Sequence, residues 1–128
     1  MRVILLTLLL VCFSHQTATS QEMCRILRRL EADAANNFAN VKNLKLPNAA
    51  QCKVDYEEPI GFWCDWNNIP RSEFEKLVKD MKTCFPQAEE LFKDDKQATL
   101  RLGRTVWFEV EWGEDVMVFG LLYRPAID

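Results

Sequence analysis

Side chains that could carry out catalysis are scarce in this chain. The sequence of 128 residues contains one histidine, His15, within an N-terminal segment that we expect to be removed. Beyond that segment the only serine is Ser72, and no histidine remains to activate it as a nucleophile. All four glycines stand singly, so none builds a phosphate-binding loop. The composition therefore argues against most hydrolases, histidine metal sites and nucleotide-binding enzymes.

Carboxylates are the remaining candidates for acid–base chemistry. Glu109 and Glu111 share one face of a predicted strand, about 6–7 Å apart by strand rise. That separation falls between those of retaining and inverting glycosidases. Two such glutamates are more commonly a solvated strand face, so we expect no catalytic residue and no enzyme. A small carboxylate-based enzyme, with Asp65 as a further candidate, stays an alternative. Asp94 and Asp95 lack calcium-loop spacing, and we expect neither metal nor cofactor.

Four cysteines beyond the N-terminal segment predict two disulfides, as is usual in small secreted domains. If residues 52–64 form a hairpin around Glu58, Cys52 lies directly opposite Cys64, within reach of a bridge. Cys24, at the start of a first predicted helix, then pairs with Cys84, at the end of a second, if the helices are antiparallel. Sequence alone allows three pairings. The cysteine spacing matches no zinc motif, which leaves metal binding as the weaker alternative.

Residues 1–20 have the pattern of a secretory signal peptide. Arg2 precedes an apolar run at residues 3–13, and small residues lead up to Ser20. The run is shorter than the roughly 20 residues that a membrane span needs. We therefore expect cleavage after Ser20 and a secreted or periplasmic protein with no membrane attachment. A retained anchor, or lipidation at Cys12, is the alternative.

Two helices are predicted in the chain beyond residue 20. Residues 21–42 carry an apolar stripe at steps of three and four, which predicts a helix; its members are Cys24, Leu27, Leu30, Ala34, Phe38 and Val41. Ser72 and Glu75 form a capping-box pattern at the start of the second helix, which Pro86 ends or kinks. Residues 87–93 are expected to add a helical turn or two, with Leu91 and Phe92 pointing inward.

The last third of the chain predicts three strands, at residues 99–102, 105–112 and 116–123. Residues of the middle strand alternate between the two faces, with Val106, Phe108 and Val110 on one side. The last strand is almost continuously apolar, as a central strand should be. Together with the hairpin, these segments predict a single α+β domain over residues 21–128. We expect an antiparallel sheet of about five strands, stabilised by disulfides, with two helices packed on one face.

One sheet face is the best candidate for binding. If Val106 and its alternating partners lie under the helices, Trp107, Glu109 and Glu111 point away from them. A turn centred on Glu114 would add three residues of the next strand, and Trp66 follows the first hairpin. The predicted partner-binding residues are Trp107, Glu109, Glu111, Phe119, Leu121, Tyr123 and Trp66. Aromatic anchors with a polar rim are typical of protein interfaces. A second copy or residues 86–96 could instead cover this face, and a one-residue slip would reverse it.

The formal net charge of −3 disfavours nucleic acid and suits a basic partner. Our interpretation is a small secreted or periplasmic binding protein without enzymatic activity, of the inhibitor or immunity type, which occludes a basic protein. The alternatives are a structural or accessory subunit of an envelope or extracellular assembly, with homodimerisation as one form, and the carboxylate-based enzyme described above.

Overall fold

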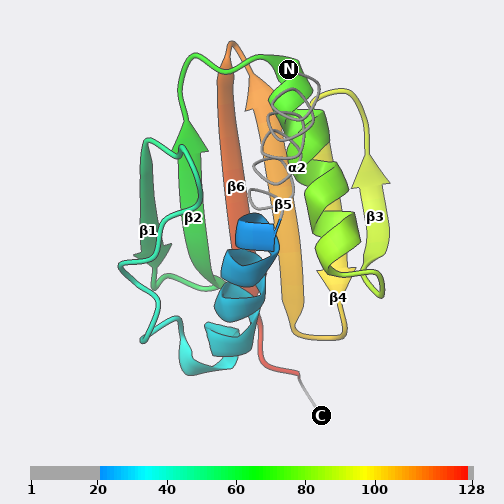
Figure 1. Cartoon of the computed structure of the whole chain (residues 1–128). Helices are drawn as coiled ribbons and strands as arrows, with labels where there is room; N and C mark the ends of the chain where they lie inside the picture. The colour runs from blue at the N-terminus through cyan, green and yellow to red at the C-terminus, as the bar shows by residue number, and fades with distance from the viewer. Residues whose placement is uncertain (1–20, 127–128) are drawn as a thin grey trace, which may run out of the picture.

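A six-stranded antiparallel sheet with helices on one face makes up residues 21–126, the part of the chain that the computed structural model describes (Figure 1). The elements are β1 (Gln51–Asp55), β2 (Ile60–Trp66), α2 (Arg71–Cys84), β3 (Glu89–Lys93), β4 (Gln97–Leu102), β5 (Val106–Gly113) and β6 (Val116–Tyr123). The strand order is β1-β2-β6-β5-β4-β3, which places the apolar β6 centrally as expected. The α+β fold is confirmed, with one more strand than expected. The predicted signal peptide lies outside the described residues.

The N-terminal helix covers residues 21–33 and continues into a short 3-10 turn, η1 (Ala34–Asn36). It is shorter than predicted because Asn37 and Phe38 adopt positive φ angles of 56° and 59°, which end a helix. The Asp33 carboxylate stabilises the turn that follows the helix by accepting hydrogen bonds from the Asn40 backbone (2.8 Å) and side chain (3.1 Å). The apolar stripe stays buried through Phe38 and Val41 even though the helix has ended.

Both expected disulfides are present, joining Cys24 to Cys84 and Cys52 to Cys64. The antiparallel arrangement of the helices that we expected is wrong. Both helices run in the same general direction, and the first begins beside the end of α2 (Figure 1). Arg28 and Glu31 accordingly border the same depression as residues 85–87, beyond the end of α2. A bridge between a helix start and a helix end is compatible with either direction, which is why cysteine positions alone could not decide.

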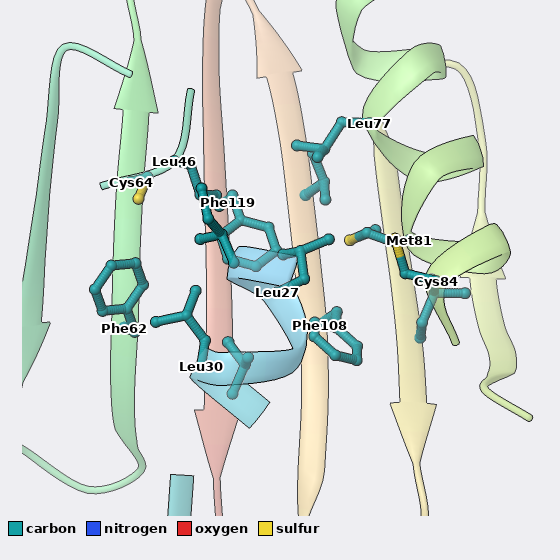
Figure 2. Close-up of a cluster of buried hydrophobic side chains, with 14 of the residues drawn as sticks. Leu27, Leu30, Leu46, Phe62, Cys64, Leu77, Met81, Cys84, Phe108 and Phe119 are labelled. Atoms are coloured by element: carbon teal, nitrogen blue, oxygen red, sulfur yellow. The ribbon is translucent and has the colours of Figure 1, made fainter. Parts of the chain in front are cut away.

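The hydrophobic core lies between the helices and one face of the sheet (Figure 2). Leu27 of the N-terminal helix and Met81 of α2 pack toward the phenyl rings of β2, β5 and β6. Phe85, just after α2, stacks on Phe108 with ring centroids 5.0 Å apart. Each large apolar side chain buried here stabilises the fold by about 1.5–3 kcal/mol. Within residues 21–126 all helical packing goes to this face, and the other face of the sheet has no helical layer (Figure 1).

Helix α2 starts without the predicted capping box. Pro70 occupies the N-cap position with extended backbone (φ −74°, ψ 158°), and no side chain caps the helix. Ser72 lies inside the first turn, because Pro70, whose φ is fixed, takes the N-cap position two residues earlier than predicted. Glu75 instead forms ion pairs with Arg71 (3.3 Å) and with Lys93 of β3 (3.2 Å).

Residues 89–93 form the edge strand β3, not the helical turns that we predicted. All five are exposed, and Leu91 and Phe92, expected to point inward, are 44% and 48% exposed. Tertiary pairing overrides the local sequence here. Glu89 pairs with Arg101 of β4, and Glu90 with Lys82 of α2. A bulge between Glu90 and Phe92 interrupts the ladder.

No helix among the described residues is long and apolar enough to cross a membrane.

Candidate binding surface

The turn between β5 and β6 decides which residues reach the helix-free face. Gly113 pairs with Val116, so the turn has two central residues, Glu114 and Asp115, both with positive φ (52° and 63°). We predicted a turn centred on Glu114, which shifts the pairing by one residue. Because side chains alternate along a strand, that slip exchanges the two faces of β6.

The corrected register removes several predicted binding residues from this surface. Phe119 and Leu121 pair with Val110 and Phe108 and are completely buried under the helices. Tyr123 pairs with Val106, so it shares the helix-covered face and packs half-buried against the core.

Trp66 is also a core residue, with 4% of its surface exposed. Its indole N–H donates a hydrogen bond of 3.0 Å to the carbonyl of Pro47. Trp107, Glu109 and Glu111 do lie on the helix-free face, where they pair with Leu122, Gly120 and Val118.

We call this helix-free side the open face. Its apolar centre consists of side chains from three adjacent strands, namely Trp63, Trp107, Val118 and Leu122. Its acidic rim consists of Asp65, Glu109 and Glu111. Val118 lies between Asp65 and Glu111 in one row across β2, β6 and β5, so apolar and acidic groups alternate. The arrangement can supply aromatic contact area and a negative border at the same time.

Trp63 is the central residue that sequence reasoning did not place here. Its indole ring lies across Gly61 and Gly120, where a Cβ atom on either glycine would overlap ring atoms. Two glycines on adjacent strands therefore create the space that fixes the indole against the sheet. The signal was available in the sequence, because Trp63 precedes Cys64 and must point away from the disulfide side of its strand.

A shallow hollow of about 270 Å³ adjoins Trp63. Gln51, Lys53 and Asp65 border it with polar side chains, and Gln51 donates a 2.9 Å hydrogen bond to the Asp65 carboxylate. Gln97 makes the equivalent contact to Glu111 at 3.1 Å. Both partners are neutral amides, so the negative charges of Asp65 and Glu111 are held in place without being neutralised.

The electrostatics of the rim favour a positively charged neighbour. Burial raises the pKa of the Glu109 carboxyl, and the adjacent Glu111 raises it further, while Arg124 acts in the opposite direction. Among the strand residues of the open face, Lys53 and Arg101 carry the opposite sign, and Arg101 is already paired with Glu89 at 2.6 Å. An approaching cation would therefore relieve repulsion between Glu109 and Glu111.

Exposed apolar residues extend the open face to the edge of the sheet. Phe92 pairs with Thr99 of β4, so it shares the side of Glu109. Leu91 is the extra residue of the bulge next to it. Together they form an exposed apolar step at the β3 edge.

Within residues 21–126, no cluster of three or more His, Cys, Asp or Glu side chains could hold a metal ion. Glu109 and Glu111 lie on an open strand surface. A comparison with known protein families and with curated proteins finds no match to the chain. Any functional assignment therefore depends on the chemistry of this surface.

Proposed function

We propose that this protein is a small non-enzymatic binding protein of the inhibitor or immunity type, which uses the open face to occlude a basic protein partner. The observation that carries the proposal is a sheet face without helices, where two tryptophans are surrounded by carboxylates. The two disulfides support an oxidising location, secreted or periplasmic.

The apolar centre has the properties of an interface anchor. Tryptophan is enriched among the residues that dominate binding energy, because one side chain supplies a large contact area at small cost in conformational entropy. Trp63 is already held across Gly61 and Gly120. An anchor fixed before binding loses little freedom on association, which favours affinity.

The acidic rim supports a partner of positive charge. Asp65 and Glu111 lie at the end of the sheet where the β5–β6 turn adds Glu114 and Asp115. Complementary charge accelerates association and weakens with added salt, so binding should be faster at low ionic strength.

The same turn gives an independent argument. Two-residue hairpin turns of this kind favour Asn-Gly, because both central residues need positive φ. Glu114 and Asp115 occupy these positions instead, and strained conformations of this kind cost about 1–3 kcal/mol each. Two acidic residues at positions where others would be more stable support a role for their charge.

The test is capture of partners from the secreted and envelope proteins of the source organism, with matched charge variants as bait. Glu109→Lys reverses a rim charge, and Glu22→Lys makes the same change on the exposed N-terminal helix. We expect a stoichiometric basic partner that is retained by wild type and Glu22→Lys and lost with Glu109→Lys. Equal capture by all three baits would overturn the proposal, as would a partner that both variants lose.

A structural or accessory subunit is the second candidate, supported by the exposed pair Leu91 and Phe92 on the edge strand β3. In that role the protein would associate with itself or with a fixed assembly partner. Sedimentation equilibrium of wild type and Phe92→Lys distinguishes the two. A wild-type oligomer that the substitution dissociates favours the subunit role, and a monomer in both favours the inhibitor role.

A further inference from the structure

A cleft lies on the helix-covered side of the sheet, away from the open face. It has a volume of about 340 Å³, within the range of small-molecule sites. Its apolar lining comes from four separate segments of the chain: Met23, Trp66, Leu77 and Met117. Methionine side chains are flexible and polarisable, so this floor can adapt to an apolar ligand.

Hydrogen bonds hold the walls of the cleft in place. The indole N–H of Trp66 donates to the carbonyl of Pro47, which also lines the cleft, at 3.0 Å. The indole N–H of Trp112 donates to the carbonyl of Ile69, another lining residue, at 2.9 Å. The Ile69 amide is bound in turn to the carbonyl of Asp115 at 2.8 Å. The cleft is therefore formed in advance of any ligand.

One face of α2 supplies the charged border of the cleft. Glu73, Lys76 and Asp80 line it at spacings of three and four residues, which share a helix face. Glu75, on the same helix but outside the cleft, is paired with Arg71 and Lys93. Among the described residues, by contrast, Glu73 and Asp80 have no cation within ion-pair distance.

The environment of Asp80 leaves its negative charge only partly compensated. Burial raises the pKa of its carboxyl, and the nearby Lys76 and Lys79 offset this only in part. Lys76 and Lys79 are exposed, whereas Glu73 and Asp80 are half-buried at the cleft. The two carboxylates outnumber Lys76, the one cation of the lining, so the border is net negative and complements an apolar molecule that carries one positive charge.

We propose that this cleft binds an organic cation with an apolar body, of the class of aralkyl primary amines. The ammonium group lies at the carboxylate of Asp80, with Glu73, two turns away on the same helix, adding negative charge to the border. The hydrocarbon part lies on Met23, Leu77 and Met117. The site is on the opposite side of the sheet from the open face, so it is independent of the proposed partner interface.

The experiment is an NMR titration of the secreted protein, its N-terminus established by mass spectrometry, with three probes of one shape. 2-Phenylethylamine carries the positive charge, 2-phenylethanol is neutral and 3-phenylpropionate is negative. We expect the amine to shift the methyl signals of Met23 and Met117 and to bind at least about tenfold more tightly than the other two. Equal binding of alcohol and amine, preference for the carboxylate, or no shift at those methyls with millimolar amine overturns the proposal.

Variants on a single helix locate the charge recognition. Asp80→Asn and Glu73→Gln should each weaken amine binding severalfold without changing alcohol binding, whereas Glu75→Gln, outside the cleft, should leave both unchanged. Thermal unfolding checks that each variant folds, and removal of the half-buried Asp80 charge is not expected to impair folding. Unchanged amine affinity in both cleft variants would also overturn the proposal, since the apolar floor alone would then explain binding.

Discussion

The two faces of one sheet are built by opposite means. On the helix-covered face, Phe62, Phe108 and Phe119 are fully buried by side chains from distant segments. On the open face, Trp63 and Trp107 are only half-buried, and Trp63 lies against two glycines of the same sheet. The first face supplies stability, and the second presents apolar area that stability does not require.

The sharpest test compares two aromatic truncations. Phe119→Ala leaves a cavity in the core and should lower the free energy of unfolding by about 3–5 kcal/mol. Trp107→Ala removes a half-buried ring and should cost much less stability while abolishing partner capture. Urea denaturation monitored by circular dichroism measures the stability of both variants, and the capture experiment measures partner binding. Similar losses from the two substitutions would show that the open face is also part of the stabilising core.

A second test adds a methyl group beneath Trp63. Gly120→Ala forces the indole away from the sheet and should destabilise by about 1–3 kcal/mol, as overpacking does. Gly113→Ala is the matched control, because no atom lies within 4 Å of its added methyl group and its φ is not positive. Unfolding curves together with Trp fluorescence report stability and the indole environment. If both substitutions behave alike, Gly120 is not the support for Trp63.

The Cys52–Cys64 disulfide and the alternation of β5 could be predicted because each depends on local geometry, and the Cys24–Cys84 disulfide followed as the remaining pair. Cys52 and Cys64 flank a short turn, and Val106, Phe108 and Val110 alternate without interruption. The strand β3 could not be predicted, since Glu89, Leu91 and Phe92 show no alternation of polar and apolar residues. They owe their extended conformation to pairing with β4. The exchange of the β6 faces had a different cause. Glu114 and Asp115 adopt positive φ without the Asn-Gly signature, so nothing local marked the turn as two residues long.

That turn is the third test of the division. Replacing Glu114 and Asp115 with Asn and Gly should relieve part of the strain in this turn and raise the free energy of unfolding by about 1–2 kcal/mol, because Gly adopts positive φ freely and Asn more readily than Glu. The same change removes two negative charges, so partner association should slow at low salt. Stopped-flow association and urea denaturation measure the two effects. A stabilised turn with an unchanged association rate would remove the turn from the proposed binding surface.

The smallest effect concerns pH and separates a carboxylate of the open face from one at the end of a helix. The fold lowers the pKa of Asp33, whereas it raises that of Glu109. Burial alone would raise the pKa of Asp33, but hydrogen bonds from Asn40 and Asn36 and the nearby Arg29 outweigh it and lower the pKa. Its stabilising contribution is therefore present above its ordinary pKa of 3.8 and lost as the pH falls through the lowered value.

The pKa of Glu109 is higher in the folded protein than in the unfolded chain, so the ionised carboxylate is less favourable in the fold and its charge opposes folding. The stability associated with it is complete below its ordinary pKa of 4.5 and declines as the pH rises through the raised folded value. Glu109→Gln should accordingly stabilise the protein slightly near neutral pH, and the difference from wild type should vanish below pH 4.5. Urea denaturation across this range measures it, with Asp33→Asn expected to destabilise near neutral pH. A stabilising Asp33→Asn, or a destabilising Glu109→Gln, would reverse the assignment of which carboxylate the fold favours as charged. Burial and the nearby Glu111 both disfavour the charge of Glu109 in the free protein, and a basic partner would offset them.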